Sequence, residues 1–190
     1  KLVLDSHFEN KEQVITLNSD FANIRINGQF DIKSLSNSAL NQLVSKIPAI
    51  PGLTSGKSQA KNRIQFYGEI KNSDLIEAIG GIPLHVVKPI TVVGKINDQN
   101  GEMYANCSAP HFIYNNTELK NGHIAITAPD DTLNYDFGAI KMNGNNSTLK
   151  LNIFGKAYDN RLTASLYFDN NGTKYMEGLL NTETVFYNSE

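Results

Sequence analysis

The sequence predicts a mainly β protein: a curved antiparallel meander, forming a taco-like trough or an open sandwich, with two short α-helices. Two observations predict it. Apolar and polar residues alternate along most of the chain, and Asn-Gly pairs separate several of the alternating runs. The chain has 190 residues, 40% of them hydrophobic, which is enough for one well-cored domain. We expect a single β-rich segment over 1–190, with a subdivision into 1–60 and 61–190 as the alternative.

The alternation has period 2, which is typical of strands with one buried and one solvated face in an antiparallel sheet. It is clearest in residues 24–32, 64–70, 149–153 and 162–168. Residues 90–190 are predicted to form consecutive hairpins. The turns are expected at four pairs that tolerate positive φ: Asn100-Gly101, Asn121-Gly122, Asn143-Gly144 and Asn171-Gly172.

Two segments have apolar residues at helical spacing instead, Ser34–Ile47 and Ser73–Ile79. Each begins with a serine, so we expect Ser34 and Ser73 to be N-caps, and Gly80 to end the second helix. Residues 48–59 are rich in Pro, Gly and Ser, which predicts a loop.

A weak repeat, an apolar residue on either side of x-Gly-x, recurs in five predicted strands. A glycine inside a strand marks a bend, a bulge or a close approach. Repeated on the apolar side, such glycines would let a sheet curl into a trough; the alternative is isolated bulges over an ordinary sandwich core. The five glycines are Gly28, Gly68, Gly94, Gly155 and Gly178.

Composition excludes several functional classes. Lys plus Arg (17) against Asp plus Glu (19) gives a net charge of −2, and no basic cluster is present, so no nucleic-acid partner is expected. The single cysteine, Cys107, excludes an internal disulfide, a cysteine zinc site and an iron–sulfur cluster within this chain.

The sequence also matches none of the common catalytic motifs. No nucleophile elbow, phosphate-binding loop or dinucleotide fingerprint is present, and no two histidines have metal-site spacing. We therefore predict no enzyme, no metal and no cofactor. A hydrolase with a dispersed site is the least favoured alternative. It would need His85, His111 or His123 to meet Asp130 or Asp131.

No run of about 18 apolar residues, as a membrane span requires, occurs in the sequence. The chain starts at Lys1 without an initiator Met and has no signal-like region. We expect it to be part of a longer protein.

Two blocks of sequence carry a resemblance to a known family. The first has VITLNSDFA at 14–22 and IRINGQFD at 24–31, before the predicted helix that ends at Ile47-Pro48. The second has FYGEIKNSDL at 66–75, then Ile82-Pro83-Leu84 and Ile96-Asn97-Asp98 ahead of the hairpins. Together they resemble a periplasmic segment of the Bacteroidetes TamB-like proteins, the translocation and assembly module of the AsmA-like superfamily.

The resemblance implies a piece of a long protein, anchored in the inner membrane, that crosses the periplasm as a β-sheet folded into a trough. Such proteins are associated with outer-membrane protein assembly and with phospholipid movement between the two membranes. The implied partners are phospholipid acyl chains or the outer-membrane protein assembly machinery.

The residues themselves support an apolar groove. Burying one methylene is worth about 0.8 kcal/mol, so an aliphatic trough can hold an acyl chain without a specific hydrogen bond. For each candidate the alternative is core packing under the helices. The candidate groove residues are Ile26, Gly28, Phe30, Phe66, Gly68, Ile70, Val92, Gly94, Ile96, Leu151 and Ile153.

A second function remains open, an independent β-sandwich module that binds carbohydrate or protein through its loops. The absence of Trp and the scatter of the eight Tyr residues disfavour a sugar-binding platform.

Overall fold

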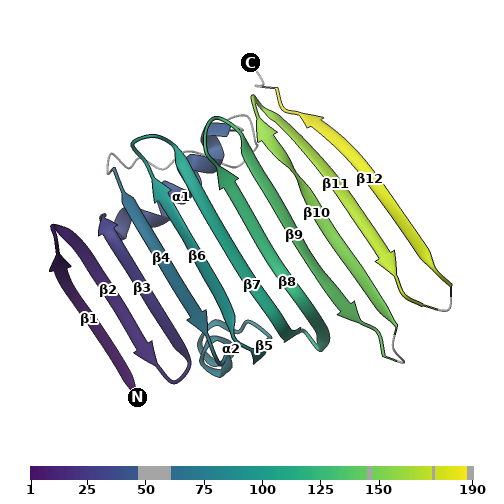
Figure 1. Cartoon of the computed structure of the whole chain (residues 1–190), viewed down its shortest axis with the longest axis horizontal. Coiled ribbons are helices and arrows are strands. Elements are labelled where there is room, and N and C mark those ends of the chain that lie inside the picture. The colour runs from purple at the N-terminus through teal and green to yellow at the C-terminus, as the bar shows by residue number, and fades with distance from the viewer. Residues whose placement is uncertain (47–60, 145–146, 173, 188–190) are drawn as a thin grey trace.

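The computed structural model describes residues 1–46, 61–144, 147–172 and 174–187; Ile47 and the predicted loop at 48–59 lie outside them. It shows one open antiparallel sheet of twelve strands (Figure 1). The predicted antiparallel β architecture is confirmed. The open-sandwich form is wrong, because the described strands all belong to this one sheet. The strands are β1 (Leu2–Glu9), β2 (Glu12–Ser19), β3 (Ala22–Gln29), β4 (Arg63–Ile70), β5 (Leu84–Lys88), β6 (Ile90–Asn97), β7 (Glu102–Tyr114), β8 (Thr117–Ala128), β9 (Leu133–Met142), β10 (Thr148–Tyr158), β11 (Arg161–Asn170) and β12 (Met176–Val185).

Eleven strands lie side by side in the order β1-β2-β3-β4-β6-β7-β8-β9-β10-β11-β12, and β5 pairs with β7. From β6 onward, strands that follow one another in the chain are also neighbours in the sheet, as predicted for residues 90–190. Short hairpin connections favour this meander. β1 and β12 are the two edges.

Three of the turns are two-residue turns with positive φ at both positions: Asn10-Lys11, Asn115-Asn116 and Asp159-Asn160. Their backbone twist matches that of the flanking strands, so each sets the register of its hairpin. The predicted turns at Asn100-Gly101 and Asn143-Gly144 are present between strands, with φ of 73° and 77° at their glycines.

The turn predicted at Asn121-Gly122 is wrong. This pair lies inside β8, where the register with β9 shifts between Lys120 and His123, and Asn121 has a φ of 52°. The pair therefore forms a bulge. Because the bulge adds one residue, Leu119 and Ile124 fall on the same side of the sheet despite their odd separation.

The prediction of two helices capped by Ser34 and Ser73 does not hold as stated. The first helical segment opens with a 3-10 turn, η1 (Ile32–Ser34), whose N-cap is Asp31, and continues as α1 (Leu35–Lys46). The second is α2 (Asp74–Gly80), seven residues long. Ser73 is the N-cap residue of α2, as predicted, but its side chain makes no capping hydrogen bond and instead accepts one from the Val86 backbone N–H. α2 ends at Gly80, as predicted, and the left-handed C-cap residue that follows is Gly81.

The two sides of the sheet differ in polarity. Residues directly opposite each other on paired strands share a side. We call one side the apolar face. One of its cross-strand rows consists of Ile26, Phe66, Gly94, Ala105, Ile126, Tyr135, Gly155 and Ala164. The opposite side, the polar face, carries Asn27, Gln65, Lys95, Tyr104, Thr127, Asn134, Lys156 and Thr163.

The core lies at one end of the apolar face, where α1 crosses several strands (Figure 1). Leu35, at the start of α1, packs against this core. We call its members the covered row; they are the buried residues Ile64, Ile96, Met103, Ala128, Leu133 and Ala157.

A buried polar network attaches this helix to the sheet. Asn62, which is 1% exposed, donates through Nδ2 to Ser34 Oγ (2.9 Å) and Ser38 Oγ (2.6 Å). Its Oδ1 accepts from the Asp31 N–H (2.8 Å), and its own N–H donates to Asp98 Oδ2 (3.0 Å). Because the side chain bonds to both η1 and α1 from just before β4, Asn62 fixes where α1 begins.

Replacing Asn62 with Ala should destabilise the protein by about 2–3 kcal/mol, because it removes three side-chain hydrogen bonds and leaves buried partners unpaired. Thermal or denaturant unfolding measures this loss. The matched control is its neighbour Arg63, whose exposed ion pair with Glu12 should be worth at most about 1 kcal/mol when Arg63 is changed to Ala. Equal losses in the two variants would contradict the role given to Asn62.

Candidate functional site

The main candidate site is the part of the apolar face that α1 does not cover. Beyond the covered row and the row of Ile26 and Phe66, a further cross-strand row runs from β1 to β12 and is apolar throughout. We call it the open row. Its members are Leu4, Leu17, Ile24, Gly68, Val92, Cys107, Ile124, Phe137, Ile153, Leu166 and Leu180.

Several open-row side chains are far more exposed than those of the covered row. In the covered row Ile64 and Ile96 are 6% and 8% exposed, whereas Ile124 and Ile153 in the open row are both 43% exposed. Leu4, Ile24 and Leu180 in the same row are exposed as well. Isolated exposed aliphatic residues are ordinary, but a continuous apolar row is typical of an interaction surface.

All the predicted groove residues within strands lie on the apolar face, at different depths. Ile26, Phe66 and Gly94 lie in the row between the covered and open rows; Gly68, Val92 and Ile153 belong to the open row. Ile70 and Leu151 lie one row further from α1. Gly28 and Ile96 lie in line with the covered row, and Phe30 packs against the core just past the end of β3.

Eight of the eleven open-row residues were not predicted as groove residues: Leu4, Leu17, Ile24, Cys107, Ile124, Phe137, Leu166 and Leu180. Ile124 follows the bulge at Asn121, where the alternation changes phase and its signal is lost. Leu180 did carry a signal, because it closes the glycine repeat centred on Gly178. Its pairing with Leu166 places it at the β12 end of the open row.

Four glycines on the apolar face lie opposite large side chains of the neighbouring strand. A Cβ at any of these glycines would collide with the side chain of its cross-strand partner. The glycine leaves room for that side chain to lie across the strand, which closes the surface without a second layer. The pairs are Val92 with Gly68, Phe66 with Gly94, Tyr135 with Gly155, and Phe168 with Gly178.

The covered row, the open row and the row of Ile26 and Phe66 between them contain no charged side chain in the described sheet. Two groups there titrate, and burial raises the pKa of both, the Cys107 thiol and the Tyr135 hydroxyl. The Tyr135 hydroxyl donates to the Thr163 carbonyl oxygen at 2.8 Å, so its polar end is satisfied. An apolar ligand would therefore meet a neutral surface.

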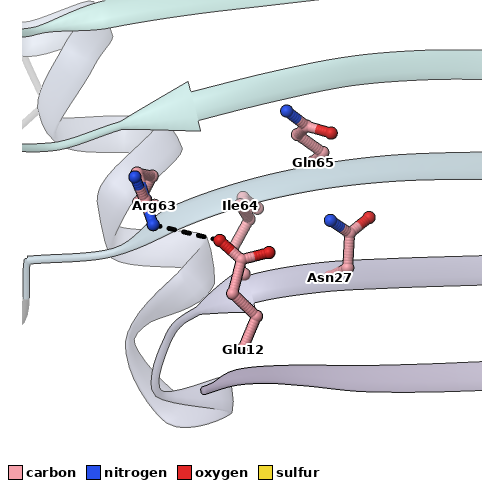
Figure 2. A pocket seen from close by; sticks show the side chains of 6 residues that line it. Glu12, Asn27, Arg63, Ile64 and Gln65 are labelled. Atoms are coloured by element: carbon pink, nitrogen blue, oxygen red, sulfur yellow. Dashed lines mark hydrogen bonds and ion pairs between the residues drawn. The ribbon is translucent and has the colours of Figure 1, made fainter. Parts of the chain in front are cut away.

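The polar face carries the charged pairs and one small hollow near β2, β3 and β4 (Figure 2). Glu12, Asn27, Arg63 and Gln65 line it, and Arg63 Nη2 donates to Glu12 Oε1 at 3.0 Å. Its volume is about 100 Å³, below the roughly 300 Å³ at which ligand pockets begin. We assign it no ligand.

The described structure does not form the convergence that a hydrolase would need. His111 bonds to Glu118 (2.9 Å) and His123 to Asp136 (3.0 Å). Asp130 follows the end of β8 at Ala128. His123 lies five residues before Ala128, so it is about 17 Å from that end of the strand.

Among the described residues, no three His, Cys, Asp or Glu side chains are grouped as a metal site. The same part of the chain has no helix that is both long and apolar enough to cross a membrane.

Replacing Gly94 with Ala should cost about 1–3 kcal/mol, because the new methyl group meets the Phe66 ring and also the backbone carbonyl of Tyr104. The matched variant Gly178→Ala should cost less, since the atoms in its way belong only to the Phe168 ring, which can rotate. Unfolding measurements on both variants test this. A larger loss for Gly178→Ala would show that the ring–glycine contacts are misassigned.

Cys107 should react slowly with iodoacetamide in the native protein, because the thiolate is the nucleophile and burial raises the pKa of this thiol. Below about pH 8.5, the usual thiol pKa, the native protein should react more slowly than the urea-unfolded chain at every pH. Above that pH, the ratio of the unfolded rate to the native rate should fall as the native thiol also ionises. Equal rates at neutral pH would contradict a partly buried Cys107.

Comparison with known proteins gives no match: no family model, no curated protein and no solved structure is similar to this chain at a significant level. The resemblance to TamB-like proteins stays a prediction.

Proposed function

We propose that this chain is a non-enzymatic periplasmic segment of a TamB-like protein, whose apolar β-groove carries phospholipid acyl chains between membranes and supports outer-membrane protein assembly. The open row is the observation that carries this proposal. The periplasmic location and the inner-membrane anchor of the parent protein rest on the sequence resemblance alone.

The length of the open row favours a conduit over a pocket. Eleven strands at about 4.8 Å spacing give a path of about 48 Å across the sheet. An acyl chain of one leaflet spans about 15 Å, half the hydrocarbon core of a bilayer. The apolar surface is therefore longer than one acyl chain and reaches both edges of the sheet, so a chain has room to move along it.

We also propose that the sheet curls toward its apolar face and so forms a trough. The glycine–side-chain pairs support this, because a glycine opposite a ring lets neighbouring strands close up on that side. Curling would place both walls of the trough against an acyl chain. Each methylene removed from water then contributes about 0.8 kcal/mol.

The edges of the sheet support the second part of the proposal, assembly of outer-membrane proteins. Within the described residues β1 and β12 each pair with one strand only. An unpaired edge can accept an extended strand of a client through backbone hydrogen bonds. The binding-module alternative required a sandwich, and the described strands do not form one.

Purified protein should carry phospholipid that solvent extraction and native mass spectrometry detect. Changing Ile153 to Glu should reduce the bound lipid at least tenfold, because it places a charge in the middle of the open row, where burying it without a partner is costly. The fold should survive, since Ile153 is 43% exposed.

The matched control is the next residue, Phe154, which is similarly exposed (38%) but lies on the polar face. Phe154→Glu should keep the bound lipid. Circular dichroism and thermal melting confirm that both variants are folded. Equal lipid in the two variants, or none in the wild type after incubation with phospholipid vesicles, would refute the groove.

A further inference from the structure

A second hollow, on β8, β9 and β10, lies where the bulge at Asn121 interrupts the pairing of β8 with β9. Its volume is about 390 Å³, within the roughly 300–1,000 Å³ typical of ligand pockets. Bulges are common next to binding sites because they redirect side chains. The polar side chains that line it are Asn121, His123, Asp136, Lys150 and Asn152.

Gly138 allows two of these side chains to approach each other. It lies between His123 on β8 and Asn152 on β10 in one cross-strand row. A Cβ at Gly138 would collide with the Asn152 side-chain oxygen and with the His123 ring. Both side chains therefore lean over the glycine from opposite sides, and the hollow is built around a position that has no side chain.

Several polar groups here have hydrogen-bonding capacity left over. His123 Nε2 lies 3.0 Å from Asp136 Oδ1, which leaves the second carboxylate oxygen available. Asn152 Oδ1 is buried and has no hydrogen-bond partner within the described part of the chain. The Lys150 ammonium lies 5.5 Å from the centre of the Tyr167 ring and makes no ion pair with a described carboxylate. Buried polar groups without partners are rare and call for an explanation such as a ligand.

We infer that this hollow binds a neutral sugar unit. The Asp136 carboxylate disfavours an anion, and the Lys150 ammonium disfavours a cation. Hydroxyl groups both donate and accept, so they suit a carboxylate, an ammonium and two amides together. The aliphatic side chain of Ile140, which shares the polar face with Lys150 and also lines the hollow, suits the C–H face of a sugar ring. The inference does not depend on the lipid groove, because it rests on the polar lining.

The test uses the whole ¹⁵N-labelled chain and backbone amide spectra, with methyl glycosides of glucose, galactose and mannose as probes. At least one glycoside should give saturable shifts confined to residues 120–123, 136–140 and 150–152. Acetate and inorganic phosphate serve as anionic probes. No saturable shift with any glycoside, or the same shifts with acetate or phosphate, would overturn the inference.

Two variants locate the site. Asp136→Asn and Asn152→Ala should each weaken glycoside binding at least about tenfold, because each removes a polar contact. Glu183→Gln is the matched control, since it breaks a similarly exposed pair on the polar face, Arg161 Nη1 to Glu183 Oε1 at 3.0 Å, away from the hollow. Amide spectra without ligand verify folding. Unchanged affinity in both site variants would refute the assignment.

A final comparison identifies the source of the sugar. The glycoside that binds is presented either as a soluble oligosaccharide or as the headgroup of a glycolipid in nanodiscs. Tighter binding to the nanodiscs indicates a glycolipid headgroup, and tighter binding to the oligosaccharide indicates a free glycan. Both results support a sugar site.

Discussion

A single layer of β-sheet cannot bury its own apolar side, and this constraint governs the whole molecule. In the described part of the chain, one buried cluster meets it where Leu35 of α1 packs against Ile64, Ile96 and their neighbours, and Ala22, Val86 and Ala109 are buried toward the other end of the strands. Asn62 holds the helix there through η1, α1 and Asp98. The burial that stabilises the fold and the exposure that offers a binding surface therefore occur on the same face, separated by a few residues along each strand.

The remaining features keep that face continuous. The bulge at Asn121 returns Leu119 to the same side as Ile124, so that β8 does not present polar residues to the groove. Glycines opposite rings let the neighbouring side chains fill the surface where a second layer would otherwise be needed. On the polar face the same bulge, with Gly138, opens a hollow of different chemistry. One sheet thus separates an apolar from a polar interaction surface.

Alternation was a sufficient signal for regular strands: residues 64–70 and 162–168 fall within β4 and β11 almost as predicted. Asn121-Gly122 was misassigned because the same dipeptide suits a turn and a bulge, and only pairing with β9 distinguishes them. Asp31 replaced Ser34 as the cap because the start of the helix depends on Asn62, distant in sequence.

The sequence indicated which residues share the apolar face, but not which of them are exposed. Ile96 and Ile153 occur in the same glycine pattern, yet one lies in the core and the other is exposed. The difference arises from where α1 crosses the sheet, which local sequence does not encode. Burial in a single-layer protein is decided by long-range placement of the covering helix.

Cross-linking with a phospholipid that carries a diazirine in its acyl chain tests the central claim most directly. After photolysis, peptide mass spectrometry locates the modified side chains. We expect labels at Ile24, Ile124, Ile153 and Leu180 on the open row, and none at Ile64 or Ile96 in the covered row. Labels gathered on the polar face, or spread equally over both faces, would contradict it.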